Sequence, residues 1–235
     1  MINLVVGEIE CKIPSQWNEI TLKEYSKIYS IIKNDAFVEP NEDQPQPTPQ
    51  EQKTLDLERD LHNIKTNRKV FSNLTGINEE TINLVDANEM SETLDLMTNF
   101  LNGDVEAMDV EDGVKNSFKY KDKKYFFPIA EMKTSTFGDF IEAAQLDMLA
   151  EKHESGKFGV IAEQMAILCR EQNEVYDEQL VMKKTKMFEN LTMDKVWGFV
   201  FFLNKQINTY KKNIQTFSNP EIEMITDTQQ TIGIL

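Results

Sequence analysis

Few side chains in this sequence are spaced for metal or nucleophilic chemistry. The histidines are His62 and His153, and the cysteines are Cys11 and Cys169. A zinc site needs about four nitrogen or sulfur ligands within reach of one ion, and these four residues are scattered along the chain. We expect His62 on the polar face of a helix and His153 near a helix end. We therefore predict no metal site.

An acidic segment at residues 104–112 has the composition of a calcium-binding loop. Such a loop needs oxygen ligands at its first, third and fifth positions and a glycine at the sixth. Counted from Asp104, the fifth position is Met108 and the sixth is Asp109, so the pattern fails. We interpret these acids as a solvated charged segment.

The sequence also lacks the common catalytic motifs. It contains no P-loop, no GxGxxG fingerprint and no GxSxG nucleophile motif. Any of its 40 acidic residues could meet in a catalytic pair, but no spacing marks one. We therefore predict a protein that is not an enzyme, uses no cofactor and works by binding other proteins.

The charge of the chain restricts its partners. The formal net charge is −15 at pH 7, whereas binding to nucleic acid or to an anionic membrane requires clustered lysine and arginine. Lysines do gather at residues 183–186 and 195–212 beside aromatic residues, as on some nucleic-acid surfaces. We favour an ordinary solvated face, or a basic patch that meets the acidic segment of a neighbouring copy.

The cellular compartment follows from the thiols and from the apolar runs. Two isolated cysteines favour a reducing compartment. The longest apolar run, residues 196–203, is about eight residues long, whereas a helix needs about 20 to span a bilayer. The apolar stretch in residues 1–10 is too short for a signal peptide. We expect a protein that is made in a cytoplasm.

The elements that position these residues occur in the same order twice. Residues 3–14 and 117–128 each predict a β-hairpin that ends in a proline. A helix follows each hairpin, at Thr21 and at Thr136, because each threonine can cap a helix and has an acidic residue three positions later.

Apolar residues at helical spacing predict the other helices. The first-half stripes are Leu22, Tyr25, Ile28 and Ile32, and then Leu57, Leu61, Ile64, Phe71 and Leu74 before a stop at Gly76. The second-half stripes are Phe137, Phe140, Ile141, Ala144 and Met148, and then Phe158, Ile161, Met165, Leu168 and Cys169. A short helix (79–85 and 178–188) and a closing helix (90–102 and 193–205) complete each half.

We therefore predict a mainly α protein with two short β-hairpins, built by internal duplication of a hairpin-plus-helices unit. The predicted segments are a first repeat (1–102) with a proline-rich extended loop (34–54), an acidic connector (103–116), a second repeat (117–212) and an extended C-terminal arm (213–235). The repeats should superpose with Tyr25 and Phe140 in equivalent positions.

Two regions are candidates for partner binding. The segment WGFVFFLN, with Trp197 and Phe201, has no polar face for about two helical turns, so it is either a core helix or one that meets another chain. The arm has apolar residues spaced to fill successive pockets on a neighbour. They are Ile222, Met224, Ile225, Ile232, Ile234 and Leu235.

Two motifs resemble a group of phage proteins. One joins a tryptophan to a threonine-capped helix start, and the other is LTG followed by an isoleucine and two glutamates. Here they are Trp17, Ile20, Thr21, Leu22, Glu24 and Tyr25, and then Leu74, Thr75, Gly76, Ile77, Glu79 and Glu80. The pattern resembles proteins encoded in the structural and tail-assembly regions of tailed phages of Bacteroides-type hosts, including the crAss-like phages. The second half departs from it, with Met132 near the tryptophan position and no LTG.

The resemblance implies a non-enzymatic structural or assembly protein that binds other virion proteins in the neck or tail region, as a ring, adaptor or packaged protein. Its place would be the virion, after synthesis in the host bacterial cytoplasm. One alternative is a tail-assembly chaperone that is absent from the mature particle. A second is a phage regulator that binds a host protein, and a third is an enzyme with an unmarked carboxylate site.

Overall fold

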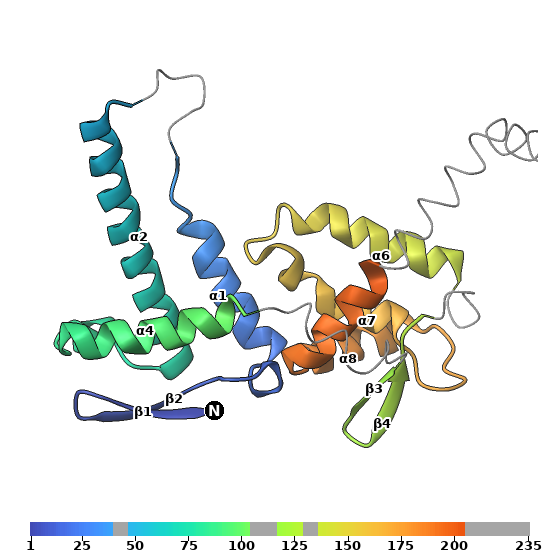
Figure 1. Ribbon diagram of the computed structural model, residues 1–235. Helices are drawn as coiled ribbons and strands as arrows, with labels where there is room; N and C mark the ends of the chain where they lie inside the picture. Colours follow the sequence, from blue (N-terminus) through green and yellow to red (C-terminus); the bar gives the residue numbers. More distant parts are fainter. Residues whose placement is uncertain (40–46, 104–116, 129–135, 205–235) are drawn as a thin grey trace, which may run out of the picture.

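The computed structural model describes residues 1–39, 47–103, 117–128 and 136–204 (Figure 1). Two antiparallel hairpins pair β1 (Ile2–Val6) with β2 (Ile9–Ile13) and β3 (Ser117–Tyr120) with β4 (Lys123–Phe126). The other elements are helical, so the prediction of a mainly α fold with two short hairpins is confirmed.

The helices of the first half are η1 (Trp17–Glu19), α1 (Leu22–Asn34), α2 (Pro49–Thr75), α3 (Glu79–Ile82) and α4 (Ala87–Leu101). Those of the second half are α6 (Phe137–Ala150), η2 (Gly156–Gly159), α7 (Ile161–Leu168) and α8 (Glu178–Phe188), and a further helix extends from residue 193 to 204. α1 packs against α2, and α7 packs against both α6 and α8.

The order of elements agrees with the predicted repeats, but the lengths of the helices differ. α2 has 27 residues, whereas α7, which holds the same place in the second half, has 8. The side chain of Phe140 lies outside the described residues, so its equivalence with Tyr25 stays a prediction. The internal duplication stays a prediction.

Capping residues decide where the first helix of each half begins. The Thr21 hydroxyl accepts a hydrogen bond from the Glu24 amide, and the Glu24 carboxylate accepts one from the Thr21 amide at 2.8 Å. Thr136 and Asp139 form the same reciprocal pair at α6. These bonds satisfy amides that the first helical turn leaves without a carbonyl partner. Both predicted helix starts are confirmed.

The predicted proline-rich loop at 34–54 is wrong at its C-terminal end, because α2 already begins at Pro49. Proline suits the first helical turn, since its fixed φ is helical and the missing N–H has no partner to lose there. Thr48 caps this helix through Glu51, as Thr21 does in α1. Residues 40–46 lie outside the described part, as do 104–116 of the acidic connector and the arm at 213–235.

Two segments far apart in the sequence pair across the two halves. Thr21 and Thr192 form an antiparallel bridge. The Leu22 amide donates to the Leu191 carbonyl at 2.7 Å, and the Met193 amide donates to the Ile20 carbonyl at 2.9 Å. The two bonds are reciprocal, because Ile20-Thr21-Leu22 runs antiparallel to Leu191-Thr192-Met193. We call this pairing of residues 20–22 with 191–193 the seam.

Aromatic rings from both halves pack beside the seam. The ring centroids of Trp17 and Trp197 lie 5.7 Å apart, and those of Tyr25 and Phe158 lie 4.8 Å apart, both edge to face. Trp197 also contacts Phe158, with centroids at 5.5 Å. These contacts continue into a single buried apolar core that includes Phe71 of the first half and Phe188 of the second. The two halves therefore share one core.

Removal of the Trp17 ring should destabilise the whole chain. Trp17→Ala should lower the free energy of unfolding by about 3–5 kcal/mol, because the ring is buried between the two halves. Urea unfolding followed by circular dichroism measures this change. Leu84→Ala is the control, since Leu84 is 88% exposed and should change stability little. A loss below about 1 kcal/mol for Trp17→Ala would contradict a shared core.

Candidate interaction surfaces

The helix of residues 193–204 contributes to the core. Met193, Val196, Phe199 and Phe202 are buried, which agrees with its interpretation as a core helix. Trp197 and Phe201 are half-buried and lie 6.3 Å apart between ring centroids. Their role in binding a partner therefore stays a prediction, and it concerns only the part of each ring that solvent reaches.

Trp197 carries one unusual polar atom. Within the described residues, its indole Nε1 is buried and has no hydrogen-bond partner. The rings of Trp17, Tyr25 and Phe158 surround the indole. The other predicted partner-binding residues lie outside the described part of the chain. They are Ile222, Met224, Ile225, Ile232, Ile234 and Leu235.

The apolar stripe on the N-terminal part of α2 is exposed, not buried in the core. Leu57, Leu61 and Ile64 are 62%, 52% and 58% exposed. The helix that these residues predict is confirmed, and Phe71 and Leu74 of the same stripe contact the core. Helical spacing predicts which residues share a face, but it does not reveal whether another element covers that face.

A different face of α2 contacts the rest of the protein. The Lys69 ammonium and the Thr66 hydroxyl both bind the carboxylate of Asp35, directly after α1, at 2.5 and 3.4 Å. His62 bonds the Asp35 carbonyl and packs against the Phe37 ring. Because residues 62, 66 and 69 lie nearly opposite 57, 61 and 64 on a helix, the apolar stripe points away from α1.

Charged side chains of both signs accompany this exposed stripe. Lys53 lies one helical turn before Leu57 and Lys65 one turn after Leu61, while Asp60 lies three residues after Leu57, and all three are exposed. Just after the C-terminal end of the stripe, Arg68 binds the Glu79 carboxylate at 2.8 Å, which links α2 to α3. Figure 1 shows the N-terminal part of α2 extending away from α4. We call Lys53, Leu57, Leu61, Ile64 and Lys65 the α2 face.

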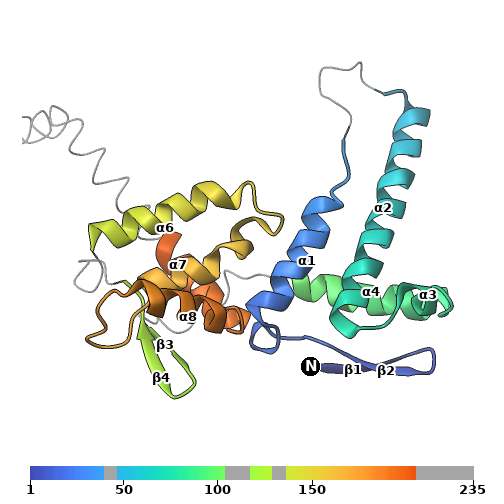
Figure 2. The same ribbon diagram turned by 180° about the vertical axis from the view of Figure 1, so that it is seen from behind.

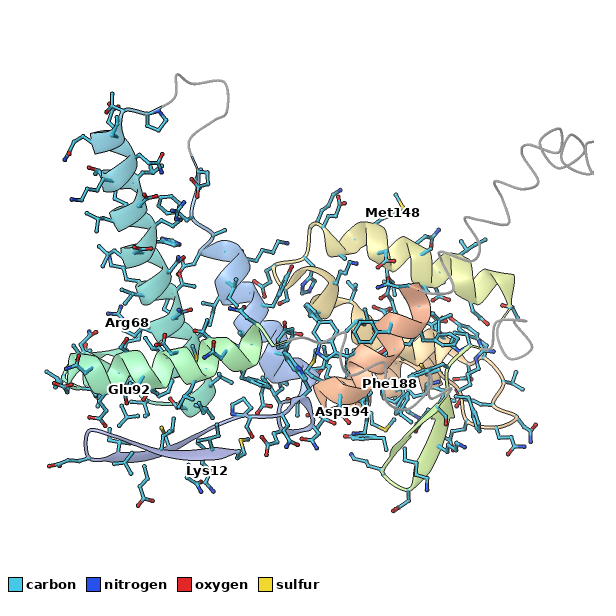
Figure 3. All side chains as sticks on the ribbon, in the orientation of Figure 1. Lys12, Arg68, Glu92, Met148, Phe188 and Asp194 are labelled. Carbon is cyan, nitrogen blue, oxygen red and sulfur yellow. The ribbon has the colours of Figure 1, made fainter. Side chains whose placement is uncertain are left out.

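A second exposed apolar face lies on α6. Ile141, Met148 and Leu149 are 43%, 76% and 56% exposed, and Figure 3 shows Met148 pointing away from the body. The predicted helix is confirmed, and Ala144 of the same stripe is exposed too. α7 covers the other side of the helix, where Gln164 donates to the Ala143 carbonyl at 2.9 Å.

Charges of both signs accompany the α6 stripe. Glu142 lies beside Ile141 and accepts a hydrogen bond from the Tyr176 hydroxyl, while Glu151 and the exposed Lys152 lie three and four residues after Met148. We call Ile141, Glu142, Met148, Leu149 and Glu151 the α6 face. The described structure thus exposes two apolar helix faces, each bordered by charges of both signs.

Two buried ion pairs lie in the second half, and one of them contains a lysine for which we predicted a solvated position. Lys184, which we had placed on a solvated basic face, is buried, with its ammonium 2.6 Å from the Glu174 carboxylate and 2.7 Å from the Cys169 carbonyl. Arg170 and Asp139 form the other pair at 2.5 Å. Burial raises the pKa of the Cys169 thiol, so this cysteine is not a ready nucleophile.

The remaining candidates for chemistry are dispersed. His153 follows the end of α6, and its Nδ1 accepts a hydrogen bond from the Ser155 amide at 3.1 Å. Among the described residues, no group of three or more histidine, cysteine, aspartate or glutamate side chains is arranged to hold a metal ion. In the same part of the chain, every helix is too short or too polar to cross a membrane.

No protein-family model matches the chain, and no curated protein or solved structure matches it either.

Stability should fall in alkaline solution in part because of Tyr25. Burial of the phenol, with a smaller effect of Tyr29, raises the pKa of Tyr25 from 10.0 to about 12. The folded state thus holds this proton more tightly than the unfolded state, so stability is lost as pH rises from about 10 to about 12. Tyr25→Phe should remove up to about 2–3 kcal/mol of that loss in urea titrations across this range. Parallel pH profiles of both proteins would contradict the assignment.

The buried Lys184–Glu174 pair should tolerate joint replacement better than the loss of one member. Lys184→Met leaves the Glu174 carboxylate buried without its cation and should cost about 3–5 kcal/mol. Adding Glu174→Leu removes the isolated charge, so the double variant should recover part of this loss in urea unfolding. A double variant less stable than Lys184→Met would show that the charge of Glu174 is satisfied elsewhere.

Proposed function

We propose that this chain is a non-enzymatic structural or assembly protein of a tailed phage, which binds other virion proteins in the neck or tail region. The observation that carries the proposal is the pair of motifs at residues 17–25 and 74–80, which resemble phage structural and tail-region proteins. A ring, adaptor or packaged protein is the form that we favour.

The motif residues have structural roles in this chain. Trp17 and Tyr25 belong to the aromatic cluster, Thr21 lies in the seam, and Gly76 ends α2 in a left-handed conformation with φ of 73°. Glu79 binds Arg68 and so fastens α3 to α2. The first motif therefore encodes part of the junction of the two halves, and the second encodes the end of α2 and its link to α3. A resemblance that rests on such structural residues supports a common architecture. It does not identify the surfaces that bind a partner.

The exposed surface supports a role in binding. Leu57, Leu61 and Ile64 lie together on one helix and Ile141 and Met148 on another, and clustered exposed apolar side chains mark contact sites for other molecules. Burial of one such side chain contributes roughly 1.5–3 kcal/mol, so a partner that covered either helix face would gain substantial free energy. These features favour a protein built into an assembly over an enzyme.

Mass spectrometry of gradient-purified phage particles tests the proposal. Peptides of this chain should be present at a constant ratio to the other structural proteins. In particles from a phage whose gene lacks the codons for residues 219–235, the chain should be missing, because we propose that Ile222, Ile225 and Leu235 bind a virion protein.

Two controls accompany this experiment. Circular dichroism of the truncated protein should match that of the full chain, since the described core ends before residue 205. Absence of the full-length chain from particles, when the lysate contains it, would leave the tail-assembly chaperone as the better hypothesis. If the truncated chain is present in particles in the normal amount, the arm does not bind a virion protein, and the rest of the proposal stands.

A further inference from the structure

The β3–β4 hairpin concentrates positive charge in a strongly acidic chain. Residues 117–128 contain four lysines and one aspartate, whereas the formal net charge of the whole chain is −15. Figures 1 and 2 both show this hairpin extending from the second half, with its turn at the outer end. A local excess of one sign attracts partners that the rest of the surface repels.

Three of the four lysines form no ion pair within the part of the chain that the structure describes. They are Lys119, Lys121 and Lys124, all exposed. The fourth, Lys123, binds the Glu171 carboxylate at 2.7 Å. The nearby Glu174 carboxylate is bound by Lys184. Asp122, in the turn, is the acidic residue that remains, so the hairpin keeps a net positive charge.

Two of the unpaired lysines lie directly opposite each other. Lys119 pairs with Lys124 in the register of the hairpin, next to the pair of Phe118 and Tyr125. Opposite residues share a face, so the two lysines point outward, while Phe118 and Tyr125 are buried on the inner face. Like charges in opposite positions destabilise a hairpin. An acidic group beside Lys119 would offset this repulsion.

The outer edge of β3 has unpaired backbone groups. The two residues of the turn have positive φ, 47° and 63°, so Tyr120 and Lys123 bond each other and Lys119 directs its N–H and C=O away from β4. The same alternation directs the Phe126 backbone outward on β4, where it exchanges hydrogen bonds of 2.8 and 3.2 Å with Arg170. No described residue bonds the Lys119 backbone in this way. β3 is therefore an edge that can accept one more strand.

We propose that β3 binds an extended acidic segment of another protein, which adds to the hairpin as a third, antiparallel strand. The backbone of the segment bonds the Lys119 amide and carbonyl, and an acidic side chain opposite Lys119 lies beside its ammonium group. Lys121 and Lys124 strengthen the attraction from further away. The inference goes beyond the proposed virion role, because it holds for any partner of this chemistry.

The geometry also specifies the sequence pattern of the partner. Successive side chains of a strand point to opposite faces. Those on the outer face lie beside Lys119 and should be acidic. Those on the inner face lie beside Phe118 and the half-buried Tyr120, so they should be apolar. The expected segment alternates acidic and apolar residues along the 4 residues of β3.

Nucleic acid fits this edge less well than an acidic peptide does. Phosphates attract lysine, but they offer no N–H donor to the Lys119 carbonyl. A nucleic acid is also a long polyanion, which would extend past the hairpin and meet a chain of net charge −15. Lysine at a sheet edge also discourages pairing between two copies of the same edge. That effect is compatible with binding of a strand of opposite charge.

A labelled peptide tests the inference with the full chain. The probe is a fluorescent, capped peptide of sequence Glu-Val-Glu-Val-Glu-Val-Glu, and fluorescence anisotropy measures its binding. The wild-type protein should bind it, more weakly as salt rises. Lys119→Glu should weaken binding by about tenfold or more, because repulsion replaces attraction at the edge. Lys53→Glu is the matched control, since it makes the same change of charge at an exposed position of α2, in the other half, and should bind as the wild type does.

The fold of the variant is checked separately. Lys119→Glu turns the repulsion from Lys124 into attraction, so its stability in urea should equal or exceed that of the wild type. A loss of binding by this variant therefore reports on the edge and not on unfolding.

Two methylated peptides separate strand addition from attraction of charge alone. In the antiparallel pairing, the glutamate amides of the probe face β3 and its valine amides face solvent. N-methylation of the glutamates should therefore abolish binding, whereas N-methylation of the valines should leave it nearly unchanged. Both peptides have the charge of the original probe.

Several results would overturn the inference. They are a wild-type protein that does not bind the probe at low salt, equal binding by the wild type and Lys119→Glu, and binding of the glutamate-methylated peptide. Tighter binding of oligothymidylate than of the probe, lost in Lys119→Glu, would assign these lysines to a nucleic acid and also overturn it. None of these measurements depends on whether the chain is present in phage particles.

Discussion

The backbone pairing of residues 20–22 with residues 191–193 is the constraint on which the rest of the structure depends. Its hydrogen bonds fix the start of α1 against the start of the helix of residues 193–204. The aromatic rings that fill the core between the halves are attached to these same two helix starts, Trp17 and Tyr25 on one side and Trp197 on the other. The seam thus holds the two sets of rings beside one another.

Several charged side chains of this protein are buried, and several large apolar side chains are exposed to solvent. Arg170, Asp139, Glu174 and Lys184 have buried side chains, whereas Leu61 and other large apolar side chains face solvent. Buried ion pairs cost desolvation free energy, which their mutual attraction and added hydrogen bonds must offset. Here they join α6, α8 and the segment between α7 and α8. The charged groups thus bind elements within the protein, and apolar side chains remain exposed on its surface.

Local signals in the sequence predicted local structure well. Thr21 and Thr136 cap helices because a hydroxyl and a following carboxylate satisfy backbone amides within four residues, with no help from the rest of the fold. Gly76 ends its helix for an equally local reason. Even the error at Pro49 was local, since Thr48 and Glu51 mark the helix start and the neighbouring prolines obscured the signal.

The spacing of residues along the chain could not predict features that depend on segments distant in the sequence. Leu61 and Phe71 lie in one apolar stripe, yet only Phe71 is buried, because the covering elements come from elsewhere in the chain. The burial of Lys184 depends on Glu174 and on the Cys169 carbonyl, which no charge pattern identifies. The two segments of the seam have similar sequences, since Ile-Thr-Leu at 20–22 resembles Leu-Thr-Met at 191–193. A comparison of helix starts across the halves could have found it.

The seam also bears on how the protein is made. About 170 residues separate Thr21 from Thr192, so the ribosome must add all of them before the first segment can find its partner. At roughly 5–20 residues per second, this interval is on the order of ten to thirty seconds. During that time Ile20, Leu22 and Trp17 lack the neighbours that later bury them. The nascent first half is therefore a candidate client for molecular chaperones until translation is nearly complete.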